Sequence, residues 1–337
     1  MEKNFSIFVG FDGFIDHILL AIDRRFGPGN HFQKIEKIQQ FAERIANASG
    51  KSTNIELFPI ERRIGGNGPI LAQTLAFYGV DIALLGALGQ PIDPIFQDLS
   101  PKIHPISIGQ PGITHAIEFE DGKLLLGITH ALDNITPQNI AEPIQKNAKN
   151  IFACDAFCLT NWTMIIHMNE ILDFFWEKLE TDRRKIAFFD LADPEKRSPE
   201  DILSLIPRLR RYAQKCFTIL GLNLKEAEQI ARLLRYRFPQ SRSTESLREL
   251  CASIQNRTSI DEVFIHDAAR CTAANNAETA FVEGFFVEHP KTITGAGDHF
   301  NAGYLLAKLQ KKSLQNCLLQ AHKISGHFVA TGNCLSL

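Results

Sequence analysis

The sequence lacks any apolar run long enough to cross a membrane, which takes about 20 consecutive apolar residues in a helix. Its first residues, MEKNFSIFVGFDG, lack the basic region and long apolar stretch of a secretory signal and lead directly into a strand pattern. An excess of charge of one sign is also missing, because the formal net charge is only -2. No general basic field therefore attracts nucleic acid or an anionic membrane. We expect a cytoplasmic protein that binds neither of them.

The cysteines are scattered and include no CxxC pair. Their number is seven, which leaves at least one unpaired. This spacing predicts neither a zinc site nor a disulfide framework. Cys154 and Cys158, in the apolar segment IFACDAFCLT, are expected to be small buried residues. Unpaired cysteines agree with a reducing cytoplasm, where disulfides are rare.

The C-terminal half shows a regular alternation of two patterns. From Asn150 onward, apolar strand segments such as KIAFFDLAD alternate with helix-periodic segments such as PEDILSLIPRLRRYAQ. Hydrophobic residues make up 45% of the 337-residue chain, which suffices for a sizeable core. The alternation predicts an α/β fold with a mostly parallel central sheet and helices on both faces.

The N-terminal half is more varied. Phe5–Gly10 is a short apolar strand that ends at glycine, and residues 103–128 look like short strands in which EDGK marks a hairpin. Residues 31–50 are helix-periodic and look like an added helix. Its predicted apolar face consists of Phe32, Ile35, Ile38, Ala42 and Ile45.

The segment TITGAGDHFNAGY places small residues directly before a carboxylate. Gly295, Ala296 and Gly297 precede Asp298, and an amphipathic helix follows. A helix N-terminus presents unpaired N–H groups, and small side chains let an anion approach them closely. The helix dipole favours an ionised carboxylate there, which can accept a proton from a hydroxyl. On spacing alone, an acidic residue at the start of an ordinary helix fits equally well.

Four segments together resemble one family. TITGAGDHFNAGYLLA resembles the C-terminal signature of the ribokinase-like (pfkB) carbohydrate kinases. GFDGFIDHI is similar to the family's first strand and substrate turn, IGGNGPILAQTLAFYG to its paired-glycine motif, and GLNLKEAEQI to its NxxE element. The resemblance covers nearly the whole chain, from Phe5 to about Thr331. It implies one ribokinase-like domain over residues 1–337 with a small β lid, drawn from segments near 17–25, 54–63 and 104–128.

The resemblance also implies a reaction. A magnesium-dependent sugar kinase of this family transfers the γ-phosphoryl of ATP to a carbohydrate hydroxyl, with the last aspartate of GAGD as general base. Asp298 would be that base. The anion hole would be the backbone of Gly295, Ala296 and Gly297. The substrate-binding residues would be Asp12, Asp16, Gly65, Gly66 and Asn67. Asn223 and Glu226 would be associated with the nucleotide and Mg²⁺, and no residue is assigned as a direct metal ligand.

Each assignment has an alternative from the residues alone. Asp12 and Asp16 also fit capping or turn roles, Asn67 fits a turn, and Glu226 fits a solvated helix position. The role of the aspartates Asp190 and Asp193 stays open. The two arginines before the glycine pair are either solvated or face a phosphate on the substrate; they are Arg62 and Arg63.

The chain also departs from the family pattern. Ile70 stands where the family commonly has an asparagine, which leaves Asn67 as the candidate substitute. FIHDAARCTAANN contains no glycine, although it takes the place of a glycine-bearing nucleotide loop. The base of the nucleotide donor therefore stays open. A catalytically silent protein that binds a sugar or a nucleotide is one alternative. A nucleoside kinase is the other alternative if lid aromatics stack on a base; these are Phe26, Phe58 and Phe119. The sugar, the hydroxyl phosphorylated and the oligomeric state stay open, including a homodimer through the lid.

Overall fold

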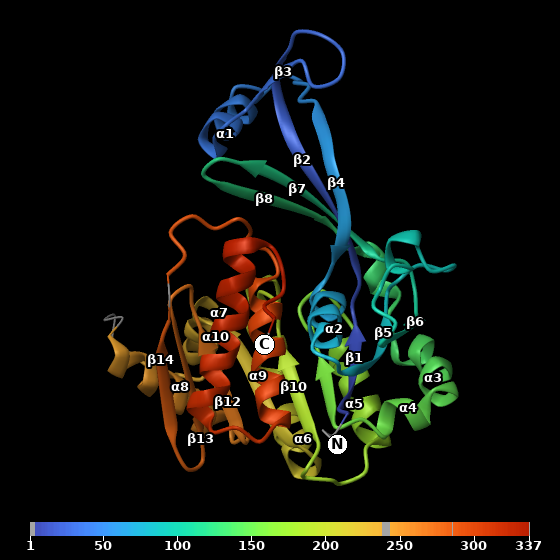
Figure 1. Ribbon diagram of the computed structural model, residues 1–337, viewed down its shortest axis with the longest axis vertical. Helices are drawn as coiled ribbons and strands as arrows, with labels where there is room; N and C mark the ends of the chain where they lie inside the picture. Colours follow the sequence, from blue (N-terminus) through green and yellow to red (C-terminus); the bar gives the residue numbers. More distant parts are fainter. Residues whose placement is uncertain (1–3, 238–242, 285, 337) are drawn as a thin grey trace.

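The computed structural model describes residues 4–237, 243–284 and 286–336, which form two sheets (Figure 1). The larger sheet has nine strands: β1 (Ser6–Phe11), β5 (Asp81–Gly86), β6 (Ile103–Ser107), β9 (Ala156–Leu159), β10 (Ile186–Asp190), β11 (Phe217–Asn223), β12 (Glu262–His266), β13 (Arg270–Asn275) and β14 (Thr279–Glu283). Their order is β14-β13-β12-β11-β10-β9-β1-β5-β6. The strands from β12 to β6 run parallel, and β13 and β14 are antiparallel additions.

Helices cover both faces of this sheet. One face carries α2 (Asn67–Phe77), α9 (Ala296–Leu309) and α10 (Leu314–Thr331). The other carries α3 (Pro137–Lys146), α4 (Ala148–Phe152), α5 (Met168–Lys178), α6 (Pro199–Lys215), α7 (Leu224–Leu233) and α8 (Thr244–Thr258). Short 3₁₀ turns lie at η1 (Pro94–Phe96), η2 (His130–Asn134) and η3 (Pro194–Lys196). Because side chains alternate along a strand, Ile7 and Val9 of β1 pack toward α2, while Phe8 packs toward α5.

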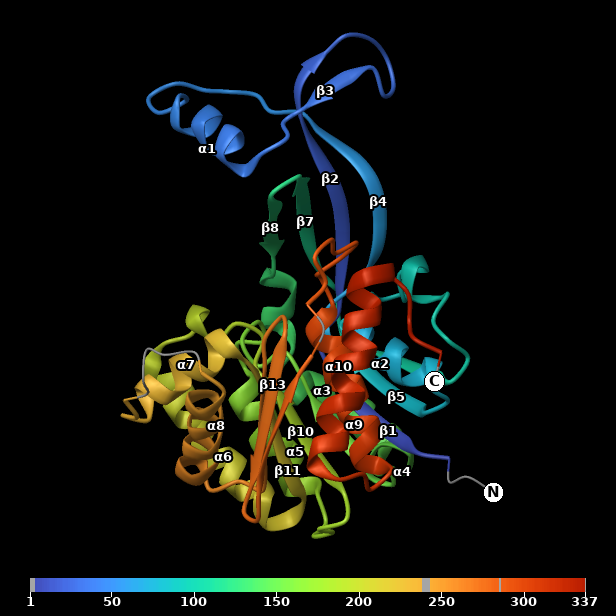
Figure 2. The ribbon, with the colours of Figure 1, turned by 60° about the vertical axis from the view of Figure 1, so that its left-hand side comes forward.

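A second sheet projects from the first (Figures 1 and 2). Its five strands are β2 (Phe14–Arg25), β3 (Phe32–Lys34), β4 (Leu57–Gly65), β7 (Gly112–Phe119) and β8 (Gly122–Ile128). We call it the projecting sheet. The long strand β2 pairs with β4 and β7 at its root and with β3 at its far end. One face near the far end is covered by α1 (Ile38–Ala46), whose Phe41 packs 5.5 Å from the ring of Phe119.

The predicted α/β architecture is confirmed, and so is the EDGK hairpin, which joins β7 to β8. All seven cysteines are free, and Cys154 and Cys158 are buried as predicted. No helix in the described parts of the chain is long and apolar enough to span a membrane.

Two predictions for the N-terminal half are wrong in detail. Residues 104–107 belong to β6 of the larger sheet, so only the later part of segment 104–128 reaches the projecting sheet. The helical face predicted for residues 31–50 is also wrong, because β3 takes up the first of these residues. The helix begins only at Ile38, and Phe41 becomes its buried residue while Ile45 is 50% exposed.

Three C-terminal segments also differ from the sequence pattern. Asn150–Ala153, predicted as strand, belongs to the end of α4 and its C-terminal turn. DEVFIHD is a strand as its pattern predicts, since it contains β12, but the rest of FIHDAARCTAANN forms a turn and β13 rather than a loop, because residues pair across the hairpin. The sequence pattern predicted the helix that begins at GAGD as the last major helix, but a further long helix, α10, follows it and packs beside it.

Candidate active site

Two glycine turns that lie far apart in the sequence meet in the structure. Gly66, with φ at +93°, precedes α2, and Gly295, with φ at +89°, precedes α9. The two helices pack side by side on one face of the sheet (Figure 1). Asn67 at the start of α2 donates a hydrogen bond from Nδ2 to Oδ1 of Asp298 over 3.0 Å. The paired-glycine motif and the GAGD motif therefore form one site.

Asp298 lies in the first turn of α9 and is 7% exposed. Burial raises its pKa well above the usual value, and the neighbouring carboxylates of Asp190, Asp12 and Asp16 raise it further. The hydrogen bond from Asn67 opposes this rise. Once ionised, such a carboxylate is a stronger base than an exposed aspartate.

The backbone at the start of α9 is only partly available to an anion. The positive φ of Gly295 is a conformation that favours glycine. The N–H of Ala296 donates to the carbonyl of Ile293 over 3.2 Å, so it is already used. Across the described residues, the N–H groups of Gly295 and Gly297 have no protein partner. Two of the three predicted donors are thus free in this structure.

Asp12 lies in the turn between β1 and β2 and is fully buried. Its Oδ2 accepts hydrogen bonds from the N–H of Asn67 and from Nδ2 of Asn161, and its Oδ1 accepts one from the N–H of Gly68, each over 2.8 Å. The hydroxyl of Thr160 lies 3.3 Å from Oδ1. Burial raises the pKa of Asp12, and these bonds oppose the rise. Both oxygens are therefore committed to holding the start of α2.

Asp16 was expected in the same turn as Asp12, but it lies within β2. It is 6% exposed, and it faces Arg63 across the β2–β4 pair. Burial raises its pKa, while a hydrogen bond from Thr114 and the charge of Arg63 lower it. A Cβ at position 65 would lie 2.2 Å from Oδ1 of Asp16, so Gly65 is needed for this carboxylate to fit.

A cleft of about 1030 Å³ lies between the projecting sheet and the helices α2, α9 and α10. Asp16 and Arg63 line it from the projecting sheet, and His299 and Phe328 line it from α9 and α10. Arg62, by contrast, pairs with Asp93 over 2.8 Å outside the cleft. Arg62 and Arg63 thus have different surroundings, because successive side chains of β4 point to opposite faces of the sheet.

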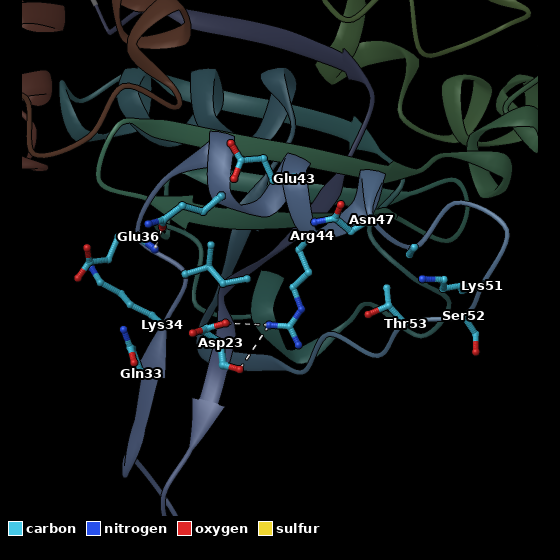
Figure 3. Close-up of a pocket in the computed structure, with 13 residues that line it drawn as sticks. Asp23, Gln33, Lys34, Glu36, Glu43, Arg44, Asn47, Lys51, Ser52 and Thr53 are labelled. Atoms are coloured by element: carbon cyan, nitrogen blue, oxygen red, sulfur yellow. Dashed lines mark hydrogen bonds and ion pairs between the residues drawn. The ribbon is translucent and has the colours of Figure 1, made fainter.

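A smaller cavity of about 510 Å³ lies in the projecting sheet beside α1 (Figure 3). Arg44 reaches from α1 toward Asp23 of β2, and Nη1 lies 3.2 Å from the Asp23 carboxylate. The same guanidinium donates to the carbonyls of Ile22 and Asn54. These hydrogen bonds hold α1 against the projecting sheet. We therefore assign no ligand to this cavity.

Asn223 and Glu226 form a capping box at the start of α7. Asn223 accepts a hydrogen bond from the N–H of Glu226 over 3.0 Å, and Glu226 accepts one from the N–H of Asn223 over 2.9 Å. The other oxygen of Glu226 accepts from the N–H of Asp193 over 2.8 Å. Burial raises the pKa of Glu226. The NxxE spacing therefore has a local structural reason besides any role with a nucleotide.

Asp190, unassigned from the sequence, ends β10 beside this capping box. Its carboxylate accepts a hydrogen bond from Nδ2 of Asn301 over 2.6 Å and one from the N–H of Ala192 over 3.0 Å. Burial, and then repulsion by Glu226, raise the pKa of Asp190 to about 7.

The turn after β12 is held without glycine. Asp267 accepts hydrogen bonds from the N–H groups of Ala269 and Arg270 over 2.9 and 2.8 Å. The preceding His266 stacks on Phe300 of α9 with ring centroids 4.8 Å apart, and burial lowers its pKa to about 4. The unusual segment is therefore an ordered hairpin beside the start of α9.

Comparison with known proteins identifies the family. A model of the prokaryotic ketohexokinase family matches residues 3–336. The chain belongs to this family. The ketohexokinase of Haloferax volcanii is 24% identical over 335 residues, which cover 97% of this chain and 87% of that protein.

Solved structures agree with this prokaryotic ketohexokinase assignment at the level of the fold. A carbohydrate kinase from Agrobacterium tumefaciens has a TM-score of 0.64 at 16% identity, covering 98% of this chain and 92% of that chain. A ribokinase from Cryptococcus neoformans in complex with ADP has a TM-score of 0.66 at 14% identity, covering 99% and 96%. The ribokinase-like fold and the pfkB resemblance are confirmed. The chain is a carbohydrate kinase, a phosphotransferase with an alcohol group as acceptor.

The sequence analysis did not single out several residues of this candidate site. Asn161 and Thr160 follow β9 and meet Asp12 only because β9 lies beside β1. Asn301 reaches Asp190 from α9. Its place one turn after Asp298 is the only sequence feature that could have indicated it.

Proposed function

We propose that this chain transfers the γ-phosphoryl of ATP to a hydroxyl of a ketohexose in a magnesium-dependent reaction. The observation that carries the proposal is the contact between Asp298 and Asn67, which joins the GAGD turn to the paired-glycine turn beside the Asp16 cleft. The ketohexose follows from the family and from the ketohexokinase of Haloferax volcanii. ATP agrees with the ADP bound to the ribokinase of Cryptococcus neoformans.

Each step can be assigned to residues of the chain. The acceptor hydroxyl attacks the γ-phosphorus while Asp298 takes its proton, and the bond to the bridging oxygen breaks to leave ADP. The free N–H groups of Gly295 and Gly297 stabilise charge on the transferred phosphoryl oxygens. Asp16 accepts hydrogen bonds from sugar hydroxyls, which are donors. Gly65 and Gly66 provide the space, and Asn67 orients the base.

The residues beside Asp298 fit a magnesium ion. Asp190 and Glu226 supply hard oxygen atoms, and burial raises the pKa of both carboxyls. Within the described residues, no group of three or more His, Cys, Asp or Glu could hold a metal ion by itself. Mg²⁺ suits such a place because it keeps several waters and binds substrate phosphates. When bound, it would neutralise phosphate charge.

The candidate lid aromatics give no support to a nucleoside. Of the three aromatic residues that would favour a nucleoside, Phe119 packs on Phe41 and Phe58 packs 4.9 Å from Phe32. Phe26 is 72% exposed, and none of the three lines the cleft. Of the charged groups there, Lys123 pairs with Glu118 over 2.7 Å. A panel of D-fructose, D-ribose and adenosine with MgATP, read by mass spectrometry, tests the choice; phosphorylation of adenosine alone would refute it.

We further propose that residues 1–337 act as one domain in which the projecting sheet is the lid. Closure would exclude water, which competes as an acceptor. A homodimer through the lid is compatible with the exposed side chains on its edge strand β8, of which Leu125 is 55% exposed. Sedimentation analysis decides between one copy and two. Seven free cysteines support a cytoplasmic location.

Asp16→Asn is expected to raise KM for the sugar and to leave KM for MgATP nearly unchanged. Losing a charged acceptor of sugar hydroxyls costs about 1.5–3 kcal/mol, which corresponds to about 10–100-fold in affinity. Steady-state kinetics with each substrate varied gives the result. Equal losses for both substrates would contradict the assignment of Asp16 to the acceptor.

Glu226→Gln is expected to raise the Mg²⁺ concentration for half-maximal activity by about tenfold. In the parent, the same requirement should rise as the pH falls below about 7, because protonation of Asp190 with its raised pKa removes negative charge from the site. Magnesium titrations at pH 6 and 8 measure both effects. Glu228→Gln, on the same helix and paired only with Arg232 within the described residues, is the control. A magnesium requirement equal to that of the parent would return Glu226 to a purely capping role.

A further inference from the structure

His299 connects the glycine turn before α9 with the C-terminal tail, which we define as residues 332–336. Its ring Nδ1 lies 2.9 Å from the carbonyl oxygen of Gly295, and its Nε2 lies 3.8 Å from Sγ of Cys334. The imidazole also stacks on Phe328 of α10 with ring centroids 3.6 Å apart. All three contacts involve the residue directly after the proposed base, Asp298.

The hydrogen-bond partners define the tautomer of His299. A peptide carbonyl only accepts hydrogen bonds, so Nδ1 must carry the proton. Burial lowers the pKa of His299, which keeps the ring neutral at physiological pH and leaves Nε2 as an acceptor. The thiol of Cys334 can then donate to Nε2. A chain of contacts thus runs from the tail through the ring to the Gly295 carbonyl.

The tail is itself fixed at a second point. Tyr78, just after α2, donates from its hydroxyl to the carbonyl of Leu335 over 2.8 Å. Asn333 and Cys334 line the same cleft as Asp16. The tail therefore bridges the end of α2 and the start of α9, and it forms part of the wall beside the phosphoryl site.

The orientation of the Gly295 carbonyl matters to the neighbouring anion site. Its lone pairs carry partial negative charge and would repel phosphoryl oxygens if they faced them. The side chain of His299 and its own N–H, at 3.0 Å, both hold this carbonyl toward α9. Ser325 of α10 holds the next carbonyl, that of Ala296, over 2.8 Å. Flipping the Gly295–Ala296 peptide would turn a carbonyl toward the anion site, and flipping the Ala296–Gly297 peptide would also withdraw the free N–H of Gly297.

We propose that His299 is a positioning residue for phosphoryl transfer, which holds the Gly295 carbonyl toward α9 and away from the anion site and is itself held by Cys334 of the C-terminal tail. The proposal rests on the proposed function, because it requires the phosphoryl group to lie at the start of α9. His299 does not touch the reacting atoms. It acts through the backbone of Gly295, and the tail acts through His299.

His299→Phe keeps the stack on Phe328 but removes the donor to Gly295. We expect kcat to fall by about 10²-fold with both KM values within about twofold of the parent, because misplacing a transition-state contact acts on kcat. His299→Asn retains a donor that can reach the carbonyl one turn back, so it should recover most of this loss. His104→Phe, on the exposed edge of β6, is the matched control and should behave as the parent.

Variants of the tail test the second contact without altering α9. Cys334→Ala removes the donor to His299 and should lower kcat by about tenfold, whereas Cys334→Ser keeps a donor and should stay within about threefold of the parent. The melting temperature of each variant is measured alongside its kinetics, to show whether the variant is folded. If His299→Phe is unfolded, the comparison between the alanine and serine variants at position 334 decides the proposal.

The outcomes separate this inference from the proposed function. Parent-like kcat in both His299→Phe and Cys334→Ala, with Asp298→Asn inactive, would overturn the positioning role alone. A loss confined to KM would also overturn it, since the residues would then serve binding. Parent-like turnover by Asp298→Asn would overturn the proposed function itself.

Discussion

Asp298→Asn is expected to lower kcat and kcat/KM together by about 10²–10⁴-fold, the usual cost of losing a general base. The carboxamide has the same shape, and its oxygen can still accept the hydrogen bond from Asn67. Binding of sugar and of MgATP should therefore change little. A coupled assay of ADP release measures the rate, and calorimetry measures the two affinities. Turnover near the parent rate would leave Asp298 as no more than the acidic residue of a helix start.

The same variant should be more stable than the parent at neutral pH. Because the folded-state pKa of Asp298 is raised, the folded protein holds this proton to a higher pH than the unfolded chain does. The stability contribution of the group is then lost as pH rises from the ordinary pKa of 3.8 through the raised value. Asparagine does not ionise, so its advantage in Tm should grow between pH 5 and pH 8. A Tm below that of the parent at pH 8 would show that the substitution damages the fold.

The pH dependence of the parent follows from the same shift. General-base catalysis requires the ionised form of Asp298, so kcat/KM should rise with pH through the raised pKa of this carboxyl. An ordinary exposed aspartate would place this rise near pH 4. A profile that is flat from pH 5 to 8 would contradict the assignment of Asp298 as the base.

How far the sequence predicts this site depends on the range of the interactions involved. The start of α9 and the start of α2 were predictable, because glycine conformation and helix N-termini are local properties. The same holds for the capping box of Asn223 and Glu226. The fold class followed from the alternation of strand and helix patterns, which is also local.

Contacts between distant segments were not predictable from spacing. Burial, and then the charge of Glu226, which follows the neighbouring strand β11, raise the pKa of Asp190, and Asn301 of α9 donates a hydrogen bond to it. The face of α1 was mispredicted because β3 pairs with the far end of β2 and shortens the helix. In both cases the residues that determine the outcome belong to another helix or strand. The pattern of a single segment does not reveal such a contact.

Asp12 shows the same limit in a residue that the sequence did single out. Its spacing from the first strand suited a sugar-binding carboxylate as well as a cap. In the structure, its partners include Asn161, which lies 149 positions away. The side chain is fully buried and accepts three hydrogen bonds of 2.8 Å. The packing of β9 against β1 thus favours a structural role, which an experiment can separate from sugar binding.

Asp12→Ala is expected to destabilise the fold by about 3–5 kcal/mol, since it leaves the buried donors of Asn67, Gly68 and Asn161 without their acceptor. At about 2–4 °C per kcal/mol, Tm should fall by roughly 6–20 °C. Asp12→Asn should be nearly as harmful, because its amide nitrogen would face donors where the carboxylate oxygens accept. Asp133→Asn, at an exposed position, is the control. If Asp12→Ala instead kept the parent Tm and raised only KM for the sugar, the carboxylate would belong to the acceptor site, as its sequence position first suggested.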